Sequence, residues 1–268
     1  MSHRLYDAHN HLQDARLGAD RDAIVSAAAR VGVVRMVVNG SCEEDWSAVL
    51  ELARRHPCAL PSFGYHPWYV RERTPHWRAE LERFLDATPS ALGEIGLDRW
   101  IENPDLAAQE ETFVWQLRLA AERDLPASIH CLKAWGWLHE LLCANPRPAR
   151  GFLLHSYGGP REMIEPLARL GAYFSFSGYF AHVRKERQRE VFKHVPPDRL
   201  LIETDAPNQS LPVELNRHPM SDPATGNPVN HPANLAVVYE FTAGLLGEPM
   251  EQLALRVEEN FARLFGAR

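Results

Sequence analysis

The chain has 268 residues, of which 45% are hydrophobic and 24% charged, and its formal net charge at pH 7 is −6. This composition is typical of a globular protein with a sizeable core, and it excludes the fibrous and disordered classes. The negative charge argues against a broad electrostatic footprint for duplex nucleic acid, although bound metal ions or a local basic cluster could neutralise a few phosphates. No run of about 18 apolar residues occurs, so we expect no transmembrane helix and no membrane partner.

The N-terminal sequence MSHRLYDAHNHL lacks the charged, apolar and small-residue order of a signal peptide. A cytoplasmic location is therefore the default expectation. The four cysteines form no C-x-x-C pair and are expected to be reduced thiols, mostly buried. They are Cys42, Cys58, Cys131 and Cys143.

Short apolar runs alternate with longer amphipathic stretches, which is the pattern of βα units around a parallel sheet. The predicted strands are, in chain order, Leu5–His11, Arg35–Asn39, Ala59–His66, Ala91–Leu97, Ala127–Cys131, Gly151–His155, Ala172–Ser177 and Leu200–Asp205. The predicted helices are Arg21–Val31, Glu43–Arg55, Trp77–Thr88, Leu106–Arg123, Trp135–Asn145, Pro160–Leu170, Lys185–His194, Ala233–Leu246 and Met250–Phe265.

This alternation predicts an α/β fold, a TIM-type (β/α)8 barrel that could be distorted, with residues 1–268 as a single domain. The alternative is an open doubly wound sheet, but the first strand ends in His-Asn-His and no Gly-rich phosphate loop is present. The long irregular segment Pro207–His231 is rich in Pro, Asn and Ser. Following the eighth strand, it is expected to cover the carboxyl end of the barrel, where barrel enzymes keep their active sites.

His9 and His11 lie two residues apart on the first predicted strand, so their side chains point to the same face. Two imidazoles at one strand end can hold a cation. Asp7 shares their strand parity, and it could orient one of these ligands without binding the cation itself. Taken alone, an H-x-H pair is also compatible with two solvent-facing or hydrogen-bonded histidines.

Further ionisable residues end or interrupt apolar strands, and an unpartnered polar group in such a place costs several kcal/mol. They are His66, Glu94, His130, His155 and Asp205. A shared cation would compensate all of them together. Imidazole with carboxylate and no thiolate suits zinc, manganese, iron or nickel, with magnesium less natural.

The order of these motifs over nearly the whole chain resembles the TatD family of metal-dependent hydrolases, usually described as deoxyribonucleases. The resemblance rests on Asp7-Ala8-His9-Asn10-His11, Gly64-Tyr65-His66-Pro67, Gly93-Glu94-Ile95-Gly96-Leu97-Asp98, His130, Leu154-His155, Glu203-Thr204-Asp205-Ala206-Pro207, Asn230-His231-Pro232-Ala233 and Asn260 through Leu264-Phe265-Gly266.

The resemblance implies two divalent metal ions. His9, His11 and Asp205 would bind one ion, His130 and His155 the second, and Glu94 would bridge both. A hydroxide between the ions would attack the substrate, with Asp205 as proton acceptor, so Asp205 and Glu94 are the predicted catalytic residues. The implied reaction is phosphodiester hydrolysis of DNA ends or oligonucleotides.

Several positions beside the predicted ligands differ from the family pattern. Leu132 replaces a common arginine, Ser156-Tyr157 replaces Cys-Phe, and His231 stands in the late N-E-P-A motif. The predicted substrate-binding residues are His66, Lys133 and Arg99. Trp135 and Trp137 could stack on a base or belong to the core.

Two other functions stay open at this point. The same binuclear site could hydrolyse an amide, ester or lactone, or the chain could be a non-catalytic partner that kept the metal site for stability. The complete set of predicted metal ligands, together with the predicted proton acceptor Asp205, weighs against a non-catalytic partner. The physiological substrate, the metal and the oligomeric state do not follow from the sequence.

Overall fold

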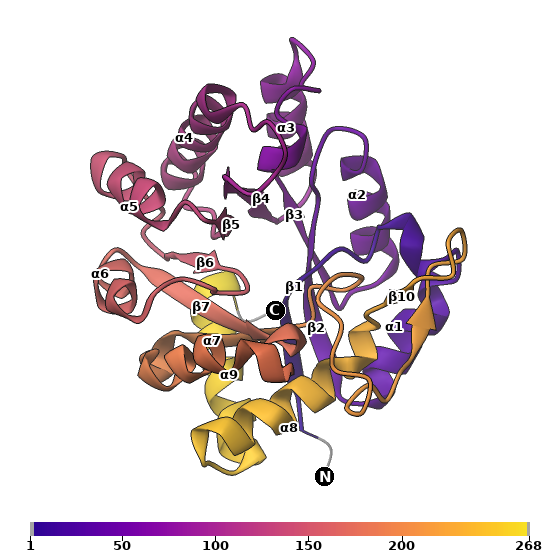
Figure 1. The fold of residues 1–268 in the computed structure, drawn as a ribbon. Coiled ribbons are helices and arrows are strands. Elements are labelled where there is room, and N and C mark those ends of the chain that lie inside the picture. Colours follow the sequence, from indigo (N-terminus) through magenta and orange to yellow (C-terminus); the bar gives the residue numbers. More distant parts are fainter. Residues whose placement is uncertain (1–2, 267–268) are drawn as a thin grey trace. The chain divides into compact units, whose positions relative to one another are not determined.

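The computed structural model describes residues 3–266, in which strands and helices alternate along the chain (Figure 1). Each of the main strands overlaps a predicted one. They are β1 (Leu5–Asn10), β2 (Val33–Asn39), β3 (Ala59–Phe63), β4 (Ala91–Asp98), β5 (Ala127–Leu132), β6 (Phe152–Leu154), β7 (Ala172–Ser177) and β8 (Leu200–Glu203). Most are buried along their whole length, as expected for parallel strands that are covered on both faces.

The predicted helices are also found, with shifted ends. They are α1 (Arg21–Arg30), α2 (Trp46–Arg55), α3 (Trp77–Ala87), α4 (Leu106–Glu122), α5 (Trp135–Ala144), α6 (Ile164–Arg169), α7 (Glu186–Val191), α8 (Leu235–Leu246) and α9 (Met250–Phe265). Aspartates fix two of the N-termini, since Asp20 and Asp105 accept hydrogen bonds from the first turns of α1 and α4. The predicted helix Lys185–His194 is shorter as α7, because 3-10 turns replace its two ends.

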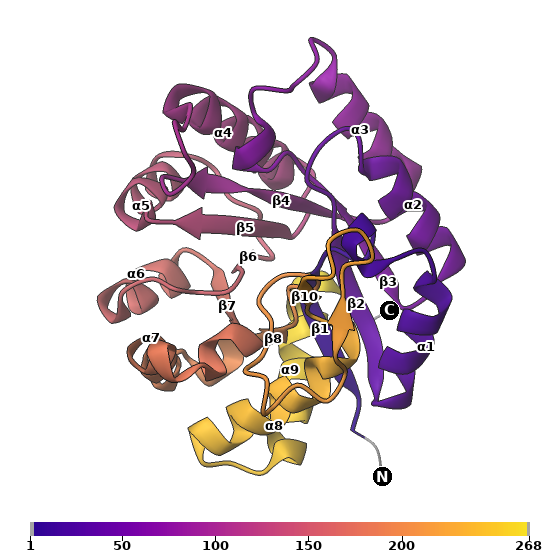
Figure 2. The same ribbon diagram turned by 45° about the vertical axis from the view of Figure 1, so that its right-hand side comes forward.

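The chain forms two compact units, residues 39–173 and the remaining residues at both ends of the chain. In the first unit β3, β4, β5 and β6 pair in that order, all parallel. Strands β4 and β5 lie side by side, and α4 packs against β4 (Figure 2). The core between them is fully buried and apolar, with Leu92, Ile95, Phe113, Leu117 and Ile129 among its members.

Two buried glutamines of α4 hold the carboxyl ends of β3 and β4. The Gln116 amide donates to the carbonyl of Tyr65 and accepts from its N–H, and Gln109 does the same for Asp98. A side chain thus takes the place of a strand partner at Tyr65. This is why β3 ends at Phe63, three residues before the end of the predicted strand, and why His66 lies in a loop.

In the second unit β7 pairs with β8 and β1 pairs with β2, again in parallel. The end of β8 also returns to β1, because the Asp205 N–H donates to the His9 carbonyl (2.9 Å) and the His11 N–H to the Ala206 carbonyl (2.7 Å). Helices α8 and α9 pack on β1 and β8 (Figure 1). On α9 the buried face repeats as Leu253, Val257, Phe261 and Leu264, the spacing of one helical stripe.

The irregular segment Pro207–His231 contains two short antiparallel strands that the sequence did not indicate, β9 (Met220–Ser221) and β10 (Pro228–Val229). Asn230 anchors its end, donating from the side-chain amide to the carbonyl of Thr204 (2.8 Å) and from the backbone to that of Pro207 (2.9 Å). The segment is therefore tied to the end of β8 by hydrogen bonds within its own unit.

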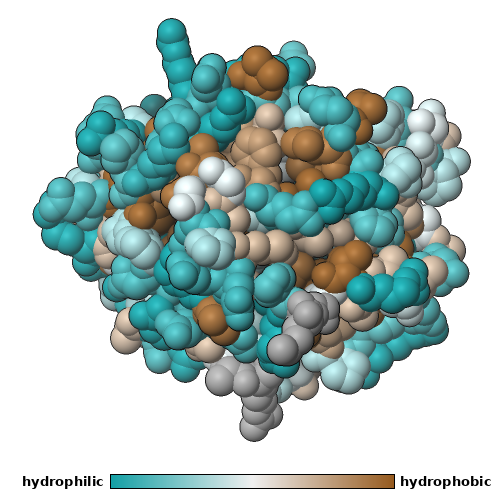
Figure 3. Space-filling view, turned by 90° about the horizontal axis from the view of Figure 1, so that it is seen from below, coloured by the Kyte–Doolittle hydropathy of each residue, from teal (hydrophilic) through white to brown (hydrophobic). Residues whose placement is uncertain are grey.

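On the face drawn in Figure 3, hydrophilic residues surround and interrupt the hydrophobic ones. Among residues 3–266, no helix is both long enough and apolar enough to cross a membrane.

Candidate metal centre

The first cluster of possible metal ligands lies where β1 and β8 end. The Nε2 atoms of His9 and His11 are 3.2 Å apart, and the Asp205 Oδ1 atom lies 3.7 Å from the first and 3.5 Å from the second. All three side chains are buried. The predicted convergence of His9, His11 and Asp205 is therefore found within this unit.

Asp7 holds the backbone of this cluster in place. Its Oδ1 accepts hydrogen bonds from the N–H groups of Thr204 (2.9 Å) and His9 (3.3 Å), and its Oδ2 accepts from the Thr204 hydroxyl (2.6 Å). Burial raises the pKa of Asp7 to about 7, although the bonds from Thr204 and Asn10 oppose that shift. Asp7 thus orients the cluster through the backbone of the two strands.

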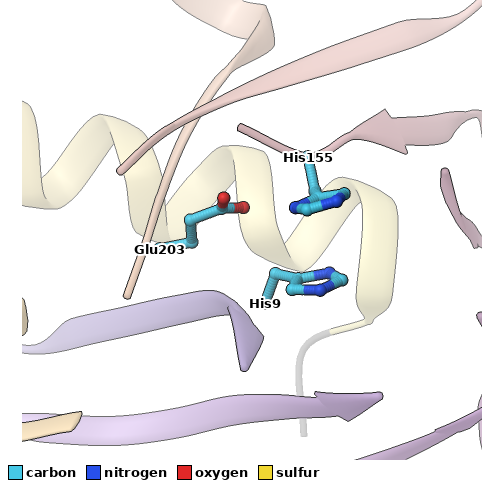
Figure 4. A group of neighbouring side chains, drawn as sticks. All are labelled: His9, His155 and Glu203. Carbon is cyan, nitrogen blue, oxygen red and sulfur yellow. The ribbon is translucent and has the colours of Figure 1, made fainter. Parts of the chain in front are cut away.

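Glu203 is a further buried carboxylate in this unit. It lies on β8, accepts a short hydrogen bond from the Ser175 hydroxyl, and has a carboxylate oxygen within 4.8 Å of a His9 ring nitrogen (Figure 4). Glu203 was not singled out as a candidate from the sequence, although it precedes Asp205 by two residues and that shared parity could have indicated its position. Figure 4 also labels His155, which belongs to residues 39–173.

The second cluster, within residues 39–173, is centred on one oxygen of Glu94. The Oε1 atom lies 2.9 Å from His155 Nε2, 3.2 Å from His130 Nδ1 and 3.2 Å from His66 Nε2. His130 Nδ1 and His155 Nε2 are themselves 3.2 Å apart. Strands β4 and β5 carry Glu94 and His130, while His155 follows β6 and His66 follows β3, so four neighbouring strands supply the group.

Asp98 fixes the orientation of His130. Its Oδ2 atom lies 3.1 Å from His130 Nε2, which makes that nitrogen the donor and turns the Nδ1 lone pair toward Glu94 and His155. Burial alone would raise the pKa of Asp98, but the hydrogen bonds from His130 and Trp68 outweigh it and lower the pKa to about 2. Burial lowers the pKa of His130, whereas the neighbouring carboxylates of Asp98 and Glu94 raise it, and the net direction is upward.

His66 differs from the other imidazoles in the role of its ring nitrogens. Its Nδ1 atom accepts a hydrogen bond from the Trp68 N–H (3.2 Å), so Nε2 carries the proton and donates to Glu94. A protonated nitrogen cannot bind a cation. This favours a supporting or substrate-contacting role for His66 over the role of a metal ligand.

The separations in the first cluster are close to those around a bound cation, and those in the second cluster are slightly shorter. Zinc and similar ions lie about 2.0–2.2 Å from imidazole nitrogen and carboxylate oxygen, and tetrahedral ligands at that distance are roughly 3.3–3.6 Å apart. The nitrogen and oxygen atoms are 3.2–3.7 Å apart in the first cluster. The corresponding separations are 2.9–3.2 Å among Glu94, His130 and His155. Each cluster thus brings lone pairs together that a divalent ion would compensate.

Two of the predicted substrate residues, Arg99 and Lys133, lie on the loops that follow β4 and β5. The Arg99 guanidinium carbon is 4.9 Å from the ring centre of Trp137, and the Lys133 Nζ atom is 4.2 Å from that of Trp100. Trp135 packs against Tyr157, and Trp137 donates its ring N–H to Glu110 (2.8 Å). Both cations are exposed, so they are available to a ligand.

In the sequence, Asp98 stands out only as the last residue of the motif Gly93–Asp98, and the sequence does not predict its contact with His130. It shares strand parity with Glu94, four residues earlier, so the same face was predictable. Its partner was not, because the register Gly96↔His130 between β4 and β5 follows from packing. Trp68 was missed altogether, since a lone tryptophan after His-Pro carries no pattern.

The profile of the family described as TatD related DNase matches residues 6–266 of this chain. The chain is 32% identical to the 3′-5′ ssDNA/RNA exonuclease TatD of Citrobacter koseri, an alignment that covers 98% of this chain and 99% of the relative. It is 28% identical to the uncharacterized metal-dependent hydrolase YjjV of Escherichia coli, with 98% of each covered.

Solved structures agree with this. The crystal structure of the E. coli YjjV protein superposes with a TM-score of 0.89 at 28% identity, covering 99% of both chains. A TatD family hydrolase from Entamoeba histolytica, at 20% identity, gives a TM-score of 0.84 with all of both chains covered. The fold class is therefore the TIM-type (β/α)8 barrel, and that prediction is confirmed.

Proposed function

Because the chain belongs to the TatD-related DNase family, we propose that it is a divalent-metal-dependent phosphodiesterase that acts on the ends of DNA or on oligonucleotides. Membership of the family makes it a metal-dependent hydrolase. The observation that carries the finer proposal is the pair of largely buried clusters, each of which brings imidazole nitrogen and carboxylate oxygen together. Relatives named 3′-5′ ssDNA/RNA exonucleases support an action directed at single-stranded ends.

The proposed ligands divide between two divalent ions. His9, His11 and Asp205 would hold one, His130 and His155 the other, and Glu94 would serve both. Zinc, manganese, iron or nickel suit this donor set better than magnesium does. When bound, two such ions supply Lewis-acid stabilisation of the phosphate oxygens and make hydroxide available near neutral pH.

The chain's own groups have separate tasks in this proposal. Asp205 accepts the proton of the attacking water, and its backbone is held beside β1 by the hydrogen bond from its N–H to the His9 carbonyl. Asp98 keeps His130 in the tautomer that presents Nδ1, and His66 donates to Glu94. Lys133 and Arg99 lie on loops where they would contact phosphate.

The net charge of −6 favours a single-stranded end over a long duplex, because it offers little attraction along a duplex backbone. We also propose that residues 1–268 act as one domain, which the match to one family profile over residues 6–266 supports. The cytoplasmic location stays a prediction that cell fractionation would test.

The experiment is to incubate metal-loaded protein with labelled single-stranded, duplex and circular DNA beside a panel of amides, esters and lactones. Shortening of single-stranded DNA from its ends, with slower loss of duplex and an intact circle, is the expected result. If the DNA stays intact while a non-phosphate substrate turns over with kcat/KM above about 10⁴ M⁻¹s⁻¹, the phosphodiesterase proposal is wrong and the amide, ester or lactone alternative replaces it.

The Asp205→Asn variant tests the proton acceptor within the same assay. It keeps size and shape but loses charge and most of its proton affinity, so kcat should fall about 10²- to 10⁴-fold. Glu165→Gln is the control, because it neutralises an exposed carboxylate that pairs only with Arg169 on the surface of α6 among the contacts described. Wild-type turnover in Asp205→Asn would show that Asp205 is not the base.

A further inference from the structure

Two tryptophans beside the second cluster are unusually exposed. Trp68 is 53% and Trp100 is 64% exposed, although large aromatic side chains are normally buried on average. Both depend on the same carboxylate, because Asp98 Oδ2 accepts from the Trp68 ring N–H (2.7 Å) and Asp98 Oδ1 accepts from the Trp100 backbone N–H (2.6 Å). The carboxylate that orients His130 therefore also positions two open aromatic rings.

Trp68 is fixed next to the second cluster. Its ring centre lies 5.0 Å from that of His66 and 6.3 Å from that of His130, in edge-to-face arrangements. Its backbone N–H donates to His66 and its ring N–H to Asp98, so both ends of the residue are held. The remaining indole surface is open to solvent next to the cluster centred on Glu94.

Trp100 combines an open ring with a positive charge. The Lys133 ammonium lies 4.2 Å from the ring centre, within the range of a cation–π contact. Lys133 has a left-handed backbone (φ 54°), which aims its side chain from the end of β5 toward the loop after β4. A phosphate near this ring would meet the ammonium, and the π-face would meet a base.

The tryptophans singled out in the sequence are less suited to this role. Trp135 uses its ring against Tyr157, and Trp137 lies under Arg99 and donates to Glu110. Of the aromatic side chains that the structure describes, Trp68 and Trp100 are the large ones most open to solvent.

We propose that Trp68 and Trp100, with Lys133, form a stacking platform for the terminal bases of single-stranded DNA. Each ring offers one base a π-face, and the Lys133 ammonium neutralises a phosphate beside Trp100. Stacking of this kind tolerates any base and excludes bases already paired in a duplex, so the platform selects single strands. The choice of DNA as ligand rests on the proposed function, whereas the open rings and the cation do not.

Binding is measured by fluorescence anisotropy on metal-loaded protein, with a labelled six-nucleotide thymidine oligomer whose phosphorothioate linkages resist hydrolysis. A second oligomer of the same length has abasic sites, so it keeps the linkages and lacks the bases. Trp100→Ala and Trp68→Leu should each weaken binding of the thymidine oligomer roughly 5- to 150-fold. The same variants should weaken binding of the abasic oligomer by less than about twofold.

Three further variants sharpen this result. Trp100→Phe keeps an aromatic face and should recover most of the binding that Trp100→Ala loses. Lys133→Asn, which tolerates the left-handed backbone, should reduce the dependence of log affinity on log salt by about 0.7. Leu255→Ala is the control, since Leu255 is also an exposed apolar residue (58%) but lies on α9 in the other unit.

The platform proposal is overturned if both tryptophan variants bind the thymidine oligomer as the wild type does. It is equally overturned if the tryptophan variants bind the thymidine oligomer and the abasic oligomer more weakly by the same factor, because the rings would then not bind the bases. Failure of the wild type to bind the thymidine oligomer also overturns it. Failure to hydrolyse any phosphodiester while this binding pattern holds would instead count against the proposed function alone.

Discussion

At the scale of single residues, Asp98 links the proposed ligand His130 to the rest of its unit. Asp98→Asn removes the charge that accepts the His130 Nε2–H, so His130 can adopt the other tautomer. Loss of such a supporting carboxylate typically weakens metal affinity 10- to 100-fold. Zinc titration with a competing chelator measures this directly.

Asp86→Asn is the matched control for that titration, because Asp86 is an exposed carboxylate that pairs with Arg123. It should bind zinc as the wild type does. Unchanged zinc affinity in Asp98→Asn would show that packing alone sets the orientation of His130.

His231 gives a prediction about acid stability. Its Nδ1 atom accepts the Ala233 N–H (2.9 Å), and burial, with a smaller contribution from His218, lowers the pKa of His231 to about 4. In the unfolded chain His231 therefore binds a proton more tightly than in the folded protein. The contribution of neutral His231 to the free energy of unfolding is complete above about pH 6.5 and is lost as the pH falls toward 4.

His231→Asn keeps a capping acceptor without a titrating ring. Its free energy of unfolding is measured by urea denaturation between pH 4 and 6.5. This free energy should fall less steeply with decreasing pH than that of the wild type, and the difference in slope corresponds to at most one bound proton. His76→Gln, at an exposed position, should follow the wild type. Parallel curves for His231→Asn and the wild type would contradict the assignment.

The sequence predicts which residues share a strand face, but it does not predict which distant residues they contact. Parity placed His9 with His11, and polar interruptions of apolar runs marked Glu94, His130 and His155. The backbone role of Asp7 depends on Thr204, which is 197 residues away. A contact of that range requires the packed structure and leaves no local sequence pattern.

At the scale of elements, Gly96 determines how closely β4 approaches β5. Its φ is +152°, and a Cβ atom there would lie 2.0 Å from the His130 carbonyl oxygen. Gly96→Ala should therefore push the strands apart at His130, lowering the free energy of unfolding by about 1–3 kcal/mol and weakening zinc binding. Urea denaturation and zinc titration measure the two effects.

Gly136→Ala serves as the comparison, because Gly136 lies in α5 with no atom within 4 Å of an added Cβ. It should leave zinc binding unchanged and stabilise the protein slightly, by about 0.4–1 kcal/mol. If Gly96→Ala behaves like Gly136→Ala, the close approach of the two strands is not what positions His130.

The alternation of strands and helices followed from hydrophobic patterns, but element ends did not. The end of β3 is set by Gln116, a residue on another element, and the 3-10 turns around α7 satisfy backbone groups locally. The β9–β10 hairpin has strands of two residues each, too short for an alternating pattern to be visible.

At the scale of the whole molecule, the proposed ligands predict close to two divalent ions per chain after reconstitution with zinc or manganese. Glu94→Ala should lose most of that occupancy, because one carboxylate serves both ions, whereas Glu165→Ala should not. Elemental analysis gives the count. Saturating metal at about 100 times its Kd should also raise the free energy of unfolding by about 2.7 kcal/mol, and finding no transition metal would rule out the binuclear site.

The return of β8 to β1 has a consequence for how the protein is made. The strands that carry His9 and Asp205 are joined by Asp7 and Thr204, 197 residues apart, so at 5–20 residues per second the ribosome completes this cluster roughly 10–40 s after starting it. Glu94, His130 and His155 lie closer together and leave the ribosome earlier. During synthesis, the donors of residues 39–173 are therefore all present, and available to a metal ion, before β8, which joins the end of β1, has been made.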